Sequence, residues 1–291
     1  MVEDCANCGA PLSGDFCASC GQSREDIRRP ALSLVTDTLD GLFSWDGRIL
    51  ATFRALYTRP GRVARNYIDG KRQTFTPPIR LYLIVSLIFF AAMAISGVRI
   101  VAVEITPDAE GGHNVIVTMF QPPREGEPVT LDQQAQDAVL EEVIGAGGSQ
   151  RWQDLAVRAM QNPEIIEEQA SAAASQALIL MVIVFTLLSA VLHPRRRLIE
   201  HVVHAFYFHA ALLIPLALLI VAGVYATLPV PFAIGYLVVS VLALNAAVAL
   251  FDRGFYGSSW FGAILRAILT SMGYATSAVF VALGLIIVAA L

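Results

Sequence analysis

One apolar stretch constrains this chain more than any other feature. Residues 79–97 read IRLYLIVSLIFFAAMAISG, with a single charge at the second position. A helix of about 20 apolar residues spans the hydrocarbon core of a bilayer. Eleven of the twenty Lys and Arg residues lie within the first 80 positions, whereas residues 98–175 hold thirteen acidic residues and four Arg. Because basic residues gather on the cytoplasmic side, we predict a membrane crossing at 79–97 with its N-terminal side in the cytoplasm.

The composition agrees with a protein that crosses the membrane several times. Of the 291 residues, 56% are hydrophobic and only 15% are charged, and the mean hydropathy is +0.61. Soluble domains carry about 25% charged residues. Further crossings are predicted at residues 177–192, 202–228, 232–251 and 260–291. Five crossings place the basic segment HPRRR at 193–197 in the cytoplasm and the C-terminus outside. Pro215 is expected to kink the third crossing.

The long loop between the first two crossings changes its periodicity. Residues 99–106 (RIVAVEIT) and 113–120 (HNVIVTMF) alternate and are rich in β-branched side chains, which predicts a β-hairpin. Helices are expected at 130–144 and 149–161, and a third helix begins at Asn162-Pro163 and runs into the second crossing. We therefore predict a small external α+β insertion over residues 98–175.

All four cysteines lie near the N-terminus, at Cys5, Cys8, Cys17 and Cys20. Two Cys-x-x-Cys-Gly pairs separated by eight residues can place four thiolates tetrahedrally around Zn²⁺, and we predict a minimal hairpin with its turn at residues 13–15. No apolar signal segment precedes the pairs, so the cysteines are expected in the reducing cytosol, where metal is favoured over disulfide. The spacing does not separate zinc from iron. A redox dithiol is less favoured because a single pair would suffice.

The predicted ribbon is not expected to bind nucleic acid. Residues 1–30 hold three Arg and five acidic residues, and four thiolates around zinc add a further formal charge of −2. Attraction to phosphates would therefore be weak. A protein is the favoured partner of the ribbon.

Residues 31–76 have an amphipathic pattern at helical spacing, interrupted at Asp46-Gly47, Arg59-Pro60-Gly61 and Asp69-Gly70. The polar side is rich in Arg. This pattern fits two arrangements, which the sequence leaves open. The helices could lie on the cytoplasmic leaflet, or they could form a hairpin packed against the transmembrane bundle.

Four motifs occur together between residues 17 and 82. The second cysteine pair ends in Cys17-Ala18-Ser19-Cys20-Gly21-Gln22, and it is followed by Arg59-Pro60-Gly61, Tyr67-Ile68-x-Gly70-Lys71-Arg72 and Pro77-Pro78-Ile79-Arg80-Leu81-Tyr82. With them the chain resembles an uncharacterised bacterial family of zinc-ribbon integral membrane proteins, of the domain of unknown function 3667 type. The resemblance is specific over residues 5–90 and looser beyond, where Glu200-His201 and His209 resemble the start of a later family helix. It implies a fold and no activity.

Five polar residues of the later crossings form a candidate intramembrane cluster: His201, His204, His209, Asn245 and Arg266. On one helix, His201 and His204 are three residues apart, and His209 lies about 80° around the axis from His201. Ionisable groups in membrane helices usually face the bundle interior, so the cluster fits either a metal, haem or proton-relay role or simple interhelical hydrogen bonding. Interhelical bonding is favoured, because no helix supplies matching carboxylates.

The sequence thus predicts a mainly α membrane bundle of five helices with a Cys₄ zinc ribbon. Its regions are the ribbon and linker (1–30), interfacial helices (31–76), the first crossing (77–97), the external loop (98–175) and the remaining crossings (176–291). The favoured function is a scaffold or regulatory protein of the bacterial inner membrane that binds another protein through its ribbon. The alternatives are a transporter, channel or export-system accessory and, less favoured, a membrane metalloenzyme. No catalytic motif supports an enzyme.

Overall fold

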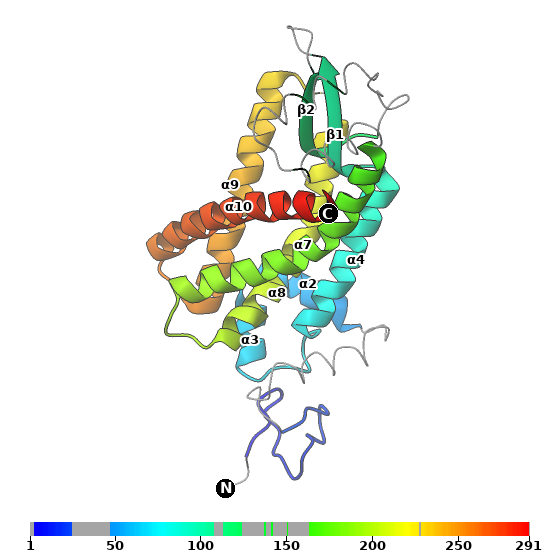
Figure 1. The fold of residues 1–291 in the computed structure, drawn as a ribbon. Coiled ribbons are helices and arrows are strands. Elements are labelled where there is room, and N and C mark those ends of the chain that lie inside the picture. The colour runs from blue at the N-terminus through cyan, green and yellow to red at the C-terminus, as the bar shows by residue number, and fades with distance from the viewer. Residues whose placement is uncertain are drawn as a thin grey trace. The chain divides into compact units, whose positions relative to one another are not determined.

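The computed structural model describes residues 3–24, 47–107, 113–123, 163–226 and 228–290, together with positions 137, 141 and 150. The described chain is mainly helical, as predicted (Figure 1). Several predicted features lie outside these residues: the helical pattern of residues 31–46, the turn at 108–112, and most of the helices expected at 130–144 and 149–161.

Four described helices are long and apolar enough to cross a membrane. They are α4 (Pro78–Ser96), α8 (Leu198–Tyr225), α9 (Val230–Tyr256) and α10 (Trp260–Ala290), the last with its apolar span over Trp260–Val281. The crossing expected at 177–192 falls in α7 (Pro163–Leu192), whose described apolar stretch, Gln176–Leu192, is shorter. The fifth crossing therefore stays a prediction.

Proline and glycine set several helix ends. Pro78 and Pro163 are the first residues of α4 and α7, where the missing N–H has no helical partner to lose. Gly257 ends α9 with φ 71°, and its N–H donates to the carbonyl of Arg253. Helix α8 continues past Pro215 to Tyr225, and the kink expected at Pro215 stays a prediction.

The chain divides into two compact units. The first consists of Met1–Phe89, Val182–Leu218 and Pro229–Ala275, and the second of Phe90–Met181, Leu219–Leu228 and Thr276–Leu291. The cysteines, the short helices α2 (Arg48–Thr58) and α3 (Arg62–Ile68), and the predicted polar residues all belong to the first unit.

Aromatic side chains fill the core of the first unit. The ring of Phe185 stacks on that of Phe208, with centroids 4.7 Å apart, and Tyr82 meets Phe206 edge-on at 5.3 Å. Tyr207 is fully buried, and its hydroxyl donates to the carbonyl of Thr76 at 2.7 Å. This bond fixes the segment that precedes α4 to the middle of the α8 sequence.

Helices α2 and α3 pack against the apolar helices. The Tyr67 ring lies 5.9 Å from that of Tyr207, and the Tyr57 hydroxyl donates to the carbonyl of Ala211 at 2.8 Å. Leu56 and Val63 are buried. Of the two arrangements that the sequence left open, contact with the bundle is therefore present, and contact with the leaflet stays a prediction.

A backbone contact between two glycines joins the α2–α3 connection to α9. Gly61 adopts φ 75°, and a Cβ added there would lie 2.3 Å from the carbonyl oxygen of Phe251. A Cβ added at Gly254 would lie 1.8 Å from the carbonyl oxygen of Pro60. Only residues without a side chain permit this approach, which explains the break at Arg59-Pro60-Gly61 that the sequence shows.

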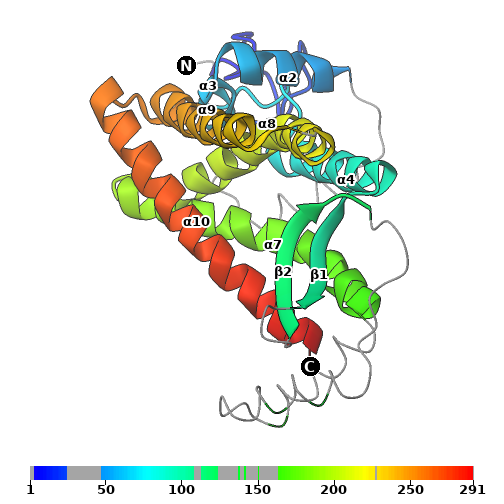
Figure 2. The same cartoon turned by 90° about the horizontal axis from the view of Figure 1, so that it is seen from above.

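The described part of the second unit contains the predicted β-hairpin. Strands β1 (Arg99–Pro107) and β2 (His113–Gln121) pair antiparallel with Val103 opposite Val117, and they lie side by side in both views (Figures 1 and 2). The Arg99 guanidinium forms an ion pair with Glu167 on α7 at 3.1 Å. The hairpin prediction is therefore confirmed, and it rested on the local alternation of side chains alone.

Candidate metal centre and buried polar cluster

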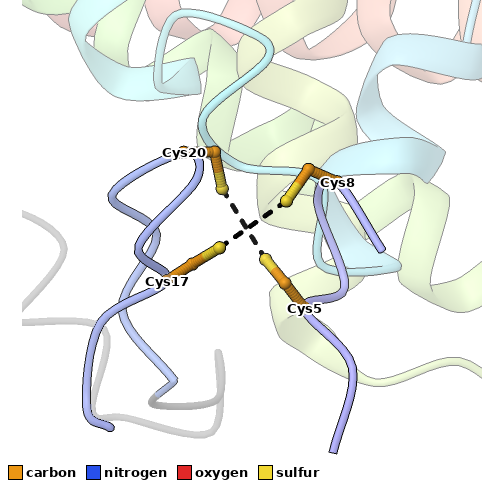
Figure 3. A group of neighbouring side chains, drawn as sticks. All are labelled: Cys5, Cys8, Cys17 and Cys20. Carbon is orange, nitrogen blue, oxygen red and sulfur yellow. Dashed lines mark hydrogen bonds between the residues drawn. The ribbon is translucent and has the colours of Figure 1, made fainter. Parts of the chain in front are cut away.

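The four cysteine side chains point toward one another (Figure 3). Their sulfur atoms all lie within 4.8 Å of one another, and the Sγ pairs Cys5–Cys20 and Cys8–Cys17 are 3.6 Å apart. A disulfide needs an S–S distance of about 2.05 Å, so the thiols are free. Zinc–sulfur bonds of about 2.3 Å in a tetrahedron require sulfur–sulfur separations of about 3.8 Å. The donor set therefore fits one metal ion.

The two cysteine pairs are built alike. The N–H of Cys5 donates to the carbonyl of Ala10, and the N–H of Cys17 donates to that of Gln22. Gly9 and Gly21 follow the second cysteine of each pair with φ 76° and 71°. These positive values require glycine at the end of each turn.

The strand pairing differs from the predicted hairpin. Asp4 pairs with Pro11, and Phe16 pairs with Ser23, so each cysteine pair forms its own small loop. Residues 13–15, expected to be the turn of one hairpin, connect the two loops instead. The prediction was wrong here because each Cys-x-x-Cys-Gly turn already reverses the chain.

Backbone N–H groups face the sulfur of Cys17. The N–H of Cys20, assisted by that of Ser19, lowers the pKa of the Cys17 thiol to about 7, whereas burial opposes this effect. Hydrogen bonds to a thiolate stabilise the charged form, which is the form that binds metal. At Cys8 the N–H of Ala10 also lowers the thiol pKa, but burial and the other three thiols outweigh it and raise the pKa to about 12. The turn therefore favours the thiolate at Cys17.

The Gln22 side chain fixes the cysteine module to the loop ahead of α4. Its Nε2 donates to the carbonyl of Gly70 at 2.6 Å, and its Oε1 accepts from the N–H groups of Arg72 and Gln73 at 3.1 and 3.4 Å. Gln22 is buried by this contact. A second, exposed hydrogen bond joins Thr74 to Asn7 at 2.9 Å. This docking could not be predicted from residue types, since main-chain atoms supply the Gln22 partners.

The three predicted histidines of α8 are all buried, but they have different surroundings. The Nδ1 atom of His201 forms a hydrogen bond of 2.6 Å with the Tyr256 hydroxyl. His209 contacts the Tyr274 hydroxyl of α10 at 3.1 Å through Nε2. Neither ring nitrogen of His204 has a hydrogen-bond partner among the described residues, and its ring stacks on that of Phe255 at 4.8 Å.

Asn245 does not join the histidines, whereas Arg266 reaches the residues around them through Asp252. The Asn245 amide donates to the carbonyl of Val241 on its own helix. Arg266 donates to the Ser258 hydroxyl at 3.0 Å and lies 3.8 Å from Asp252. Among the described contacts, none links Asn245 to the other four residues, which disfavours a transport path built from all five.

Three residues that the sequence did not single out complete the buried cluster: Ser189, Asp252 and Tyr256. The Tyr256 hydroxyl lies 2.6 Å from Ser189 Oγ, and its ring stacks on that of His193 with centroids 3.6 Å apart. His193 Nε2 lies 3.1 Å from an Asp252 carboxylate oxygen. Ser189 lies near the end of α7, whereas Asp252 and Tyr256 are one turn apart at the end of α9. Only the packing of the two helices brings them together.

The arrangement of this cluster is that of interhelical hydrogen bonding. Its groups link the C-terminal end of α7 to the start of α8 and the end of α9. Among the described residues, the four cysteines are the one group of three or more Cys, His, Asp and Glu side chains close enough to share a metal. The geometry thus gives the histidines no metal-ligand set.

Comparison with known proteins adds one finding. Residues 46–90, which cover α2, α3 and the first part of α4, match the family described as "Protein of unknown function (DUF3667)". Searches of curated proteins and of solved structures gave no match. The resemblance drawn from the motifs is thereby supported over residues 46–90, where the chain is similar to this family.

Proposed function

We propose that this chain is a scaffold or regulatory protein of the bacterial inner membrane, whose zinc-bound ribbon presents a docking surface for another protein in the cytosol. The observation that carries the proposal is the fixed position of the cysteine module. Four thiols leave a bound ion no open position for catalysis, and Gln22 holds the module against the segment that enters α4.

The charge and the surface of the ribbon favour a protein partner. Phe16 is 68% exposed, although it lies beside the buried Cys17. An exposed aromatic side chain on a small rigid module is a typical anchor of a protein interface. The acidic balance of the ribbon disfavours nucleic acid, as the sequence indicates.

Zinc is the metal we propose, because four thiolates at tetrahedral spacing are the common ligand set of structural zinc sites. The metal is expected to supply most of the stability of the module, since only Cys5, Cys17 and Gln22 are buried among its described residues.

Photocrosslinking from the ribbon in native membranes tests the proposal. A photoreactive residue replaces Phe16 in the full chain, and the matched control replaces Ser13 in the exposed connection between the loops. We expect one discrete protein adduct from position 16, a much weaker one from position 13, and loss of the adduct when Cys8→Ser is added. Equal adducts from both positions, or an adduct indifferent to Cys8→Ser, would refute docking through a folded ribbon.

A further inference from the structure

A pocket with a strongly basic lining lies within the first unit. Its volume is about 1000 Å³. It is bordered by the α2–α3 connection, by α3 and by the connection between α9 and α10. Six lining side chains are cationic and none is acidic: Arg59, Arg62, Arg65, Lys71, Arg196 and Arg253. This is an unusual concentration of one sign of charge around a single hollow.

The glycine contact described above builds this pocket. Gly61 and Gly254 bring the Arg59–Arg62 connection against the last turns of α9. Arg62 and Arg253 therefore line the same hollow from segments that are far apart in the sequence. The close approach of the two backbones at Gly61 and Gly254 therefore places cationic side chains from both segments around one pocket.

The positive charge is only partly neutralised by neighbouring carboxylates. Arg65 pairs with Asp69 at 2.8 Å, and Glu200 lies 3.6 Å from Arg65 and 3.5 Å from Arg196. Three other cations of the lining, Arg59, Arg62 and Lys71, form no ion pair with a described residue. Like charges that converge on a hollow attract an anion, because the potentials of the individual groups add there.

One part of the lining is apolar and exposed. Leu250 and Trp260 are 41% and 53% exposed, and the Arg253 guanidinium lies 4.6 Å from the centre of the Trp260 ring. Both apolar residues belong to helices long enough to cross a membrane. Trp and Arg at such helix ends are typical of the headgroup level of a bilayer. A ligand that matches this lining has an anionic end and an apolar end.

We propose that this basic pocket binds the phosphate headgroup of an anionic phospholipid. Arg59, Arg62 and Lys71 contact the phosphate oxygens, and the apolar end of the lipid lies along Leu250 and Trp260. A soluble phosphate compound shares the headgroup chemistry and lacks the apolar part. The two sources are therefore distinguishable by experiment.

Lipid binding to the purified full-length chain in neutral detergent tests this proposal by native mass spectrometry. The probes are phosphatidylglycerol, the zwitterionic phosphatidylcholine, and inorganic phosphate as a competitor. Arg62→Gln and Lys71→Gln each remove one pocket charge from an exposed side chain, and Arg54→Gln removes the same charge from an exposed position of α2 outside the pocket.

We expect preferential binding of phosphatidylglycerol, and about fivefold weaker binding in each pocket variant, as one Lys or Arg at an anionic surface contributes. Arg54→Gln should change binding less than twofold. Equal losses in all three variants would mean diffuse attraction and overturn the pocket. Displacement by inorganic phosphate with no preference between the two lipids would assign the pocket to a soluble phosphate and overturn the lipid assignment.

Discussion

The ribbon and the helical part of the first unit are stabilised in opposite ways. In the described ribbon, two cysteines and Gln22 are the buried side chains, and four sulfur atoms converge on one point. In the helical part, aromatic rings such as Phe185 and Phe208 pack at 4.7 Å, and polar groups bond in pairs across helices. With so few buried side chains, the ribbon is expected to draw its stability from a bound metal, whereas the helical part draws it from packing. Removing either source of stability should therefore leave the other region intact.

Metal loss is the largest expected effect. Cys8→Ser removes one ligand, and structural zinc contributes on the order of 10 kcal/mol to the folding of comparable small modules. We expect bound metal to fall from about one ion per chain to none, with proteolysis confined to the first 24 residues. Elemental analysis and limited proteolysis measure this. Unfolding of the helices at the same time would break the comparison.

The backbone contact between glycines gives the next largest effect. Gly254→Ala places a Cβ where the Pro60 carbonyl oxygen lies, so the helical part should lose about 3 kcal/mol of stability. Gly235→Ala is the matched control on α9, because no atom lies within 4 Å of its added Cβ. The control should be neutral or slightly stabilising. Denaturant unfolding in detergent measures both, and equal behaviour would contradict the contact. Metal content should stay unchanged.

Tyr256→Phe tests whether the hydrogen bonds of the buried cluster stabilise the packing of the helices. It removes the hydroxyl shared by His201 and Ser189 and leaves buried polar groups unsatisfied, at a cost of about 1–3 kcal/mol. Ser240→Ala on the same helix removes a hydroxyl that bonds only to the Tyr236 carbonyl. It should change stability by less than about 0.5 kcal/mol. A similar loss in both variants would show that the cluster adds no interhelical stability.

The smallest expected effect concerns the junction between the two regions. Gln22→Ala removes the hydrogen bonds to Gly70, Arg72 and Gln73, so the ribbon should detach while it keeps its metal. Hydrogen exchange at the N–H groups of residues 72 and 73 should accelerate about tenfold, the equivalent of one buried hydrogen bond. Thr74→Ala, which breaks only the exposed bond to Asn7, serves as the control and should leave this exchange nearly unchanged. Metal loss in Gln22→Ala would contradict a docking role.

Features encoded by neighbouring residues could be predicted from the sequence. The spacing of Cys5, Cys8, Cys17 and Cys20 predicts their convergence, the apolar run predicts α4, and the alternation after Gly97 predicts the hairpin. Each signal lies within about 20 residues. The shape of the ribbon itself was mispredicted, because each cysteine turn closes its own loop.

Features that depend on contacts between distant segments could not be predicted. Ser189 belongs to α7, and Asp252 and Tyr256 belong to α9. Only the packing of these two helices brings the three side chains to His193 and His201. Nothing in the sequence around Gly254 indicates that the Pro60 carbonyl lies against it, because this contact joins two segments that are far apart in the chain. Asn245 stands out in the sequence by its polarity alone, and its side chain bonds within its own helix.

The Gln22 contact has a consequence for how insertions act on this chain. The Gln22 side chain forms hydrogen bonds with main-chain atoms of residues 70, 72 and 73, and α4 begins at Pro78. One residue added between these points must be absorbed by the short connection, or it turns α4 by about 100° relative to the metal module. The orientation of the cysteine module around the helix axis is thus coupled to the rotational phase of α4, and side-chain changes in the connection leave this coupling intact.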